Sequence, residues 1–362
     1  MSDQGRRSSS PLRTPQPGAS HAWRHGIRRV SSAPAVLLGA WLVTMIASLP
    51  FMLLMRGLLL EHLGASLAAD TAASGINYDW MQEFAAQASG VGRTFRPAVI
   101  GFAAVLDNLS AFIDNSRPAS LVAIALMYSG LWLFLAGGVI NRFARDRATH
   151  SHGFFMASGV FFLRFLRLGL LMAAVYGALF RGLHLLMFDK LYPRLTHEVT
   201  VERTAFLIRV GLYLVFGFVL MLCNLVFDFA KIRAVVEDRR SMIGATAAAI
   251  RFLWRHGPAA IGLFMANGAL FLVVLGAYAV VAPGVGGTGW VMWIGLLIGQ
   301  LYIMARLWVK LAFWASETSL FQGRLAHAGY VAAPAAEWPD SPLAEALARS
   351  ALSHGLEQVG QD

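Results

Sequence analysis

The chain has 362 residues, of which 57% are hydrophobic and only 14% are charged. An ordinary soluble domain carries about 25% charged residues, so this composition indicates a polytopic membrane protein and leaves no room for a separate soluble enzyme domain. The net charge is +10. In a membrane protein such an excess gathers on cytoplasmic loops against anionic lipid, and nucleic acid is not expected as a partner. The single cysteine, Cys223, excludes an intramolecular disulfide and a cysteine zinc site.

Six apolar stretches are each long enough to cross a bilayer as a helix. A hydrocarbon core about 30 Å thick needs about 20 residues at a rise of about 1.5 Å each. We therefore predict an all-α, polytopic membrane helix bundle with spans over residues 35–55, 119–140, 168–188, 205–227, 258–281 and 290–309. Arg181 and His184 interrupt the outer part of the third stretch, so this span either ends near Arg181 or continues to Phe188.

The other segments differ from the spans in composition. Residues 1–33 are rich in Ser, Pro and Arg and predict a disordered, basic cytoplasmic arm. Apolar residues recur at helical spacing within 97–115, which indicates an amphipathic helix, either a lid over the outer face or a helix packed on the bundle. The predicted division is therefore an arm at 1–33, a membrane domain at 34–315 with its outer loop at 56–118, and a cytoplasmic tail at 316–362 with a short helix at 342–352.

The distribution of basic residues sets the orientation, because Lys and Arg are retained at the cytoplasmic ends of spans. The N-terminal arm has six basic residues and one acidic residue, the loop 141–167 has five and one, and the loop 228–257 has six and three. The loop 56–118 on the other side has four basic and six acidic residues. We therefore expect both termini in the cytoplasm and the protein in the bacterial inner membrane.

Short sequence echoes indicate an internal repeat. They are FARDRA at 143–148 with FAKIRA at 229–234, RFL at 164–166 with RFL at 251–253, and GALF at 177–180 with GALF at 268–271. Their order is preserved, so each copy would run from a span through a basic turn, an amphipathic cytoplasmic helix and an Arg-Phe-Leu elbow into the next span. This pattern predicts two copies of parallel topology, at about 119–188 and 205–281.

The segment VVEDRRSM at 235–242 and the alanine-rich stretch after it resemble the cytoplasmic segment of bacterial YciC-type proteins. They are similar also to the membrane domain attached to some glycerophosphodiester phosphodiesterases. The resemblance covers about residues 119–315 and implies a helical membrane module. It brings no active site, because the soluble phosphodiesterase barrel is missing. In the same segment Glu237 and Asp238 are expected at the positive N-terminal end of a helix, with Ser241 as the cap of its continuation.

Arginines near the cytoplasmic ends of the spans are candidates for contact with anionic lipid headgroups. The alternative is generic positive-inside anchoring, which needs no dedicated headgroup site. The candidate headgroup contacts are Arg164, Arg167, Arg239, Arg240, Arg251 and Arg255.

Polar residues inside the spans form a second candidate site, because burial of such groups in lipid is costly. They are Arg181, His184, Asn224, Asn267 and Gln300. The ordinary alternatives are an arginine that extends to the interface and amides that hydrogen-bond between helices. A solvent-accessible cavity lined by Arg181 and the three amides would favour transport, and a closed interior packed with Leu and Phe would favour an accessory role.

Motifs of metalloproteases, serine hydrolases and phosphate-binding loops are missing, so we expect no catalytic residue, metal or cofactor. The sequence predicts a non-catalytic accessory or membrane-organising protein that contacts anionic lipids or another membrane protein. A small permease or lipid transporter is the alternative, and an intramembrane enzyme is a second one.

Overall fold

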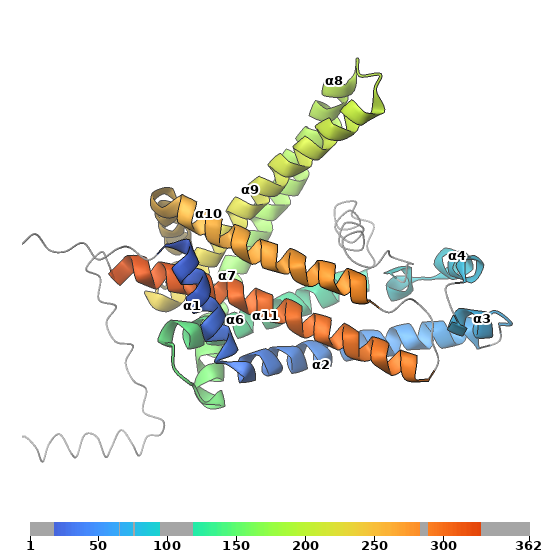
Figure 1. Ribbon diagram of the computed structural model, residues 1–362, viewed down its shortest axis with the longest axis horizontal. Helices are drawn as coiled ribbons and strands as arrows, with labels where there is room; N and C mark the ends of the chain where they lie inside the picture. The colour runs from blue at the N-terminus through green and yellow to red at the C-terminus, as the bar shows by residue number, and fades with distance from the viewer. Residues whose placement is uncertain (1–17, 65, 75–76, 95–118, 283–288, 327–362) are drawn as a thin grey trace, which may run out of the picture.

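The computed structural model describes residues 18–64, 66–74, 77–94, 119–282 and 289–326, which fold into helices and the turns between them (Figure 1). In chain order the elements are α1 (Ala19–Ser31), α2 (Pro34–Leu63), α3 (Ala69–Ser74), α4 (Tyr78–Gln87), the 3-10 helix η1 (Gly90–Thr94), α6 (Ala119–Arg145), α7 (Ser151–Ala178), the π-helical segments η2 (Leu179–His184) and η3 (Leu186–Leu191), α8 (Tyr192–Thr196), α9 (Glu202–Val236), α10 (Met242–Val281) and α11 (Trp290–Ala326). The predicted all-α class is confirmed. The helices predicted at 97–115 and 342–352 lie outside the described residues.

Five helices in the described part of the chain are long and apolar enough to cross a membrane. They are α2, α9, α10, α11 and one continuous helix that comprises α7, η2, η3 and α8. A helix needs no backbone partner outside itself, which is why apolar helices of this length suit a bilayer. The protein is therefore a multi-pass membrane protein.

The third predicted span is longer than either alternative proposed for it. The helix runs without interruption over 46 residues, from Ser151 to Thr196. The helix does not end at Arg181, whose side chain is exposed, so its charge is not buried. The helix does not end at His184 either, whose ring packs on two aromatic rings, 4.5 Å from that of Phe188 and 5.3 Å from that of Phe216. The wider π-helical turns lie in this part of the helix, and such turns are uncommon within α-helices.

The prediction of disorder throughout residues 1–33 is wrong for the part that the structure describes. Residues 19–31 form α1, which packs on α11 and buries Ala22, Gly26 and Val30. These three residues recur every fourth position and therefore line one face of a helix. At Gly26 the two backbones are so close that an added Cβ would lie 2.5 Å from the Cα of Ser316.

Helix α11 continues past the predicted boundary of the membrane domain at residue 315, as far as Ala326. Its polar residues Ser316 and Thr318 are fully buried, and their hydroxyls donate to the carbonyls of Ala312 and Trp314 one turn earlier. Such bonds satisfy a hydroxyl within its own helix, so the polar stretch does not stop α11.

The predicted amphipathic helices with Arg-Phe-Leu elbows are not separate elements. The first predicted elbow, at Arg164, lies inside the uninterrupted α7. The second predicted cytoplasmic helix, with its elbow at Arg251, is the first part of α10. The bend in α10 falls at His256, whose φ is −127°, two residues before Pro258. Proline lacks an N–H and clashes with the preceding turn, which places the bend there and not at Arg251.

The core lies at one end of the molecule. It is formed by α1, by the parts of α6, α7, α9 and α10 nearest the turns α6–α7 and α9–α10, and by the last half of α11. Four phenylalanines in it are fully buried: Phe143, Phe165, Phe229 and Phe321. From this end α7 with α8 and the first half of α9 project as a hairpin, in a direction away from α2, α10 and α11 (Figure 1). The apolar residues of the diverging parts are largely exposed.

Candidate functional site

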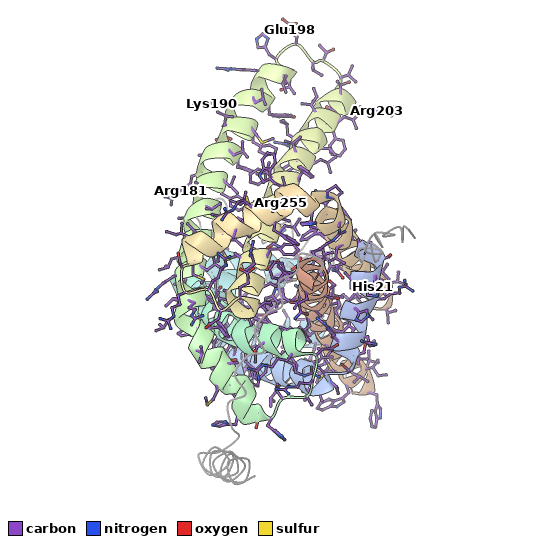
Figure 2. All side chains as sticks on the ribbon, turned by 90° about the vertical axis from the view of Figure 1, so that its left-hand side faces the viewer. His21, Arg181, Lys190, Glu198, Arg203 and Arg255 are labelled. Carbon is purple, nitrogen blue, oxygen red and sulfur yellow. The ribbon has the colours of Figure 1, made fainter. Side chains whose placement is uncertain are left out.

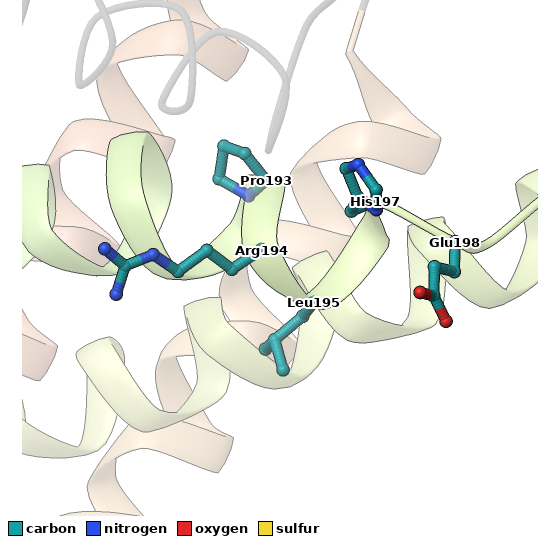
Figure 3. Close-up of a pocket in the computed structure, with 5 residues that line it drawn as sticks. All are labelled: Pro193, Arg194, Leu195, His197 and Glu198. Atoms are coloured by element: carbon teal, nitrogen blue, oxygen red, sulfur yellow. The ribbon is translucent and has the colours of Figure 1, made fainter.

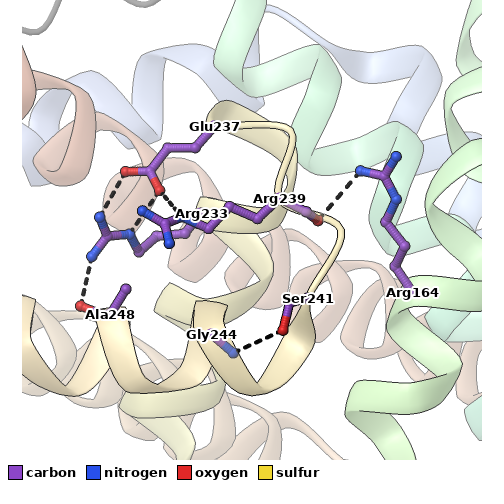
Figure 4. Close-up of polar contacts among 7 residues, drawn as sticks. All are labelled: Arg164, Arg233, Glu237, Arg239, Ser241, Gly244 and Ala248. Atoms are coloured by element: carbon purple, nitrogen blue, oxygen red, sulfur yellow. Dashed lines mark hydrogen bonds and ion pairs between the residues drawn. The ribbon is translucent and has the colours of Figure 1, made fainter.

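The turn between α9 and α10 holds a network of arginines around the carboxylate of Glu237 (Figure 4). Arg233 donates two hydrogen bonds to the Glu237 carboxylate, of 3.1 and 2.7 Å, and one of 2.6 Å to the carbonyl of Ala248 on α10. Arg239 donates to the same Glu237 carboxylate. Paired N–H donors on a carboxylate fix the relative orientation of the two groups, so Glu237 orients Arg233, and Arg233 ties the end of α9 to α10.

Asp238 connects this turn to α7. Its Oδ1 accepts a hydrogen bond of 2.5 Å from Nη1 of Arg164, and its backbone has a positive φ of 47°. Aspartate is one of the few residues other than glycine that adopts this conformation readily. Glu237 and Asp238 therefore follow the end of α9 and do not begin a helix as the sequence predicted. The predicted cap at Ser241 is confirmed, since its Oγ accepts from the Gly244 N–H at 3.2 Å.

Burial alone would raise the pKa of Glu237, but hydrogen bonds from Arg233 and Arg239 outweigh that effect. The pKa of Glu237 is therefore lowered below its ordinary value. A carboxylate whose pKa is lower in the folded state stabilises the fold above the ordinary pKa, and this stabilisation is lost as the pH falls through the folded value.

We expect Glu237→Gln to lower the thermal stability of the protein at pH 7, because the neutral amide cannot hold two arginines. The difference from wild type should shrink as the pH falls below the ordinary glutamate pKa and the wild-type carboxylate takes up a proton. Thermal unfolding in detergent over a series of pH values measures this. Glu198→Gln, at an exposed glutamate, is the control, and a difference at Glu237 that does not change with pH would contradict the assignment.

The six predicted headgroup arginines fall into two groups. Arg164 and Arg239 form ion pairs with Asp238 and Glu237, so their charges are compensated within the protein. The other four are exposed and make no ion pair with the described residues; they are Arg167, Arg240, Arg251 and Arg255. Arg255 lies on α10, near the base of the projecting hairpin (Figure 2).

The five predicted intramembrane polar residues are not brought together into one site. Gln300 accepts a hydrogen bond of 3.0 Å from the indole of Trp41, which ties α11 to α2. Asn267 donates to the Ser316 hydroxyl at 2.8 Å, which ties α10 to α11. Arg181 is exposed on the hairpin (Figure 2). Gln300 and Asn267 thus serve as contacts between helices, which is the common use of such groups in membranes, whereas Asn224 donates to Asp228 within α9.

Surface hollows occur at two places in the described part of the chain. One, at the tip of the hairpin, is lined by exposed residues only, Pro193, Arg194, Leu195, His197 and Glu198 (Figure 3). The other lies along α2 between Met52 and Leu63. Neither is lined by Arg181, His184 or the three amides. Within the described ranges His, Cys, Asp and Glu side chains form no group of three that could hold a metal ion.

The structure reveals a buried group of ionisable residues between α9 and α11, which we call the charge cluster: Asp228, Lys231, Lys310 and Glu317. Asp228 is 5% exposed and Lys231 is 8% exposed, and the Lys231 ammonium donates to Asp228 at 2.8 Å. Asp228 also accepts from the amide of Asn224 at 3.1 Å and from the indole of Trp314 at 3.3 Å. These three donors compensate the buried negative charge.

Two tryptophans complete the charge cluster. The ammonium of Lys310 lies 3.4 Å from the ring centre of Trp132 on α6 and 5.7 Å from that of Trp314. The two indole rings meet edge to face at 5.9 Å. An aromatic face attracts a cation, more strongly when water is removed, so α6 contributes to holding Lys310 between the helices.

The spacing of the charge-cluster residues in the sequence is a signal for this cluster, but the positions of the predicted spans make it easy to overlook. Asp228 and Lys231 are three residues apart within an apolar run, and Lys310 and Glu317 are seven apart. Both spacings place the two members of each pair on one face of a helix. Each pair adjoins the end of a predicted span, where polar residues are ordinary, so position along the sequence alone does not indicate burial.

No protein-family model, curated protein or solved structure matches the chain.

Proposed function

We propose that the chain is a six-span protein of the bacterial inner membrane with both termini in the cytoplasm, and that it is a non-catalytic accessory or membrane-organising protein that contacts anionic lipids. The sixth span is α6, which covers the second apolar stretch of the sequence. The turns α6–α7 and α9–α10 then lie on the cytoplasmic side, as their basic residues favour. The resemblance to YciC-type membrane modules and the parallel repeat remain part of this proposal.

The observation that carries the proposal is the exposed arginine set at the packed end of the bundle. Arg167, Arg240, Arg251 and Arg255 have no carboxylate partner among the described residues, whereas Arg164 and Arg239 are neutralised beside them. Buried core residues make this end rigid, so the four charges are held on the packed helices α7 and α10 and on the turn that precedes α10. Charges of this kind near a bilayer attract anionic headgroups, by about 1 kcal/mol each.

The interior favours this function over a small permease. Of the polar residues that would line a transport path, Gln300 and Asn267 make separate contacts between helices, Asn224 bonds within α9 and Arg181 is exposed. Phe and Leu side chains fill the core. An intramembrane enzyme would need a nucleophile and a base, or a metal site, and no such constellation supports that alternative.

Replacing the four exposed arginines by glutamine should sharply lower the amount of anionic phospholipid that stays bound through purification in mild detergent. Four contacts of about 1 kcal/mol each would together change retention by more than tenfold. Mass spectrometry of the copurified lipids measures the effect, and helical content should be unchanged.

The matched control replaces four exposed basic residues of the projecting hairpin by glutamine, namely Arg181, Lys190, Arg194 and Arg203. This set removes the same total charge from the other end of the helices. It should leave lipid retention nearly as in the wild type. Equal losses from the two sets would show that net charge alone binds the lipid, and the proposed contact surface would be abandoned.

A further inference from the structure

Unlike Asp228 and Lys231, Glu317 has no hydrogen-bond partner among the described residues, and unlike Lys310 it is fully buried. Its side chain is fully buried, and neither carboxylate oxygen has a donor among the described residues. An isolated carboxylate in such a place is very unfavourable, because nothing replaces the water that solvates it in the unfolded chain. The group therefore requires a feature that removes or compensates its charge.

The polar groups around Glu317 are engaged elsewhere. The hydroxyls of Ser316 and Thr318 donate to carbonyls of α11 itself. The Lys231 ammonium and the Trp314 indole both donate to Asp228. The neighbouring donors are thus satisfied without Glu317.

The charged groups of the surrounding helices do not supply a free counterion either. From α9, Asp228 and Lys231 act on the Glu317 carboxyl, and these two already form a pair. Lys310, two turns earlier on α11, rests on the ring of Trp132 of α6. On the other helices packed against α11, Arg29 of α1 contacts Gln322 and Asp146, and Arg233 of α9 lies over the Phe321 ring and pairs with Glu237. Arg142 of α6 is buried with its Nη1 unpartnered, but it is not among the charges that act on Glu317. Asn267 of α10 and Trp41 of α2 are neutral.

We propose that Glu317 is a proton-binding site in the interior of the protein. In the folded state at neutral pH its carboxyl group carries a proton and is uncharged. When the O–H bond ionises, the proton leaves to solvent and a second negative charge remains beside Asp228, with Lys231 as the counterion that both carboxylates share. Binding and release of this proton then change the contact between α9 and α11, since Lys231 belongs to the first helix and Glu317 to the second.

Infrared spectroscopy of the full chain in detergent tests the proposal directly, because a protonated carboxyl group has a C=O stretch distinct from that of a carboxylate. The wild-type spectrum at pH 7 should contain this band, and the band should disappear as the pH is raised. Glu317→Gln should remove it at pH 7. Glu198→Gln, at the exposed hairpin tip, should leave it unchanged.

Thermal stability provides a second measurement that a purely structural role would not reproduce. Glutamine mimics the neutral carboxyl, so Glu317→Gln should be about as stable as wild type near the ordinary glutamate pKa and more stable than wild type at pH 7. It should also lack the wild type's loss of stability at higher pH, which arises because the unfolded chain releases the proton that the folded chain holds. Any of three results would overturn the proposal: the band is missing from wild type at pH 7, the band survives in Glu317→Gln, or Glu317→Gln is clearly less stable than wild type at pH 7. The lipid-retention experiment is independent of these outcomes.

Discussion

Asp228→Ala should be the most destabilising single substitution in the charge cluster, at about 3–5 kcal/mol. The carboxylate accepts hydrogen bonds from Lys231, Asn224 and Trp314, and all three donors lose their partner when it is removed. The main loss comes from Lys231, because a buried ammonium without a counterion is far less stable than one in water. The substitution should therefore lower the unfolding temperature strongly.

The single cysteine offers a reporter for this experiment. Cys223 is partly buried in α9, close in sequence to Asp228, so unfolding in detergent can be followed by its reaction with a thiol-reactive dye. Asp189→Ala, at an exposed aspartate of the hairpin, should change the unfolding temperature little. Combining Asp228→Leu with Lys231→Met should recover part of the lost stability, since both buried charges are then gone. An Asp228→Ala protein as stable as Asp189→Ala would show that the pair is not compensating a buried charge.

Gly26→Leu should detach α1 from α11. A Cβ at this position would lie 2.5 Å from the Cα and 2.6 Å from the N of Ser316, and backbone atoms cannot move aside as a flexible side chain can. Overpacking of this kind costs about 1–3 kcal/mol, which α1 can avoid only by leaving its place. Ala22 and Val30 would then be exposed, and the hydrogen bond of 3.0 Å between Arg29 and Gln322 would be lost.

Limited trypsin digestion measures this detachment. The bonds after Arg28 and Arg29 lie in the last turn of α1, and they should be cleaved much faster in Gly26→Leu than in wild type. Gly39→Leu in α2 is the control, because a Cβ there meets nothing within 4 Å. If both variants are cleaved at the wild-type rate, the close approach of α1 to α11 does not hold the helix in place.

The amino-acid sequence alone determined the class of this protein. Apolar runs of about 20 residues cannot fold stably in water and must form helices in lipid, so the all-α membrane bundle follows from composition and spacing. The Ser241 cap follows from its local sequence, since a capping hydroxyl bonds a backbone N–H only three residues away. Interactions over such short distances are independent of how the helices pack.

Only the tertiary structure decided which polar residues are buried and which are paired. Asp228 and Glu317 lie far apart in the sequence and come into one environment because α9 packs against α11. The sequence likewise could not distinguish Arg164, which Asp238 neutralises, from Arg167, which remains exposed one turn later on the same helix. In both cases the partner is supplied by another helix, and neither hydropathy nor helical periodicity specifies which face of one helix meets which face of the next.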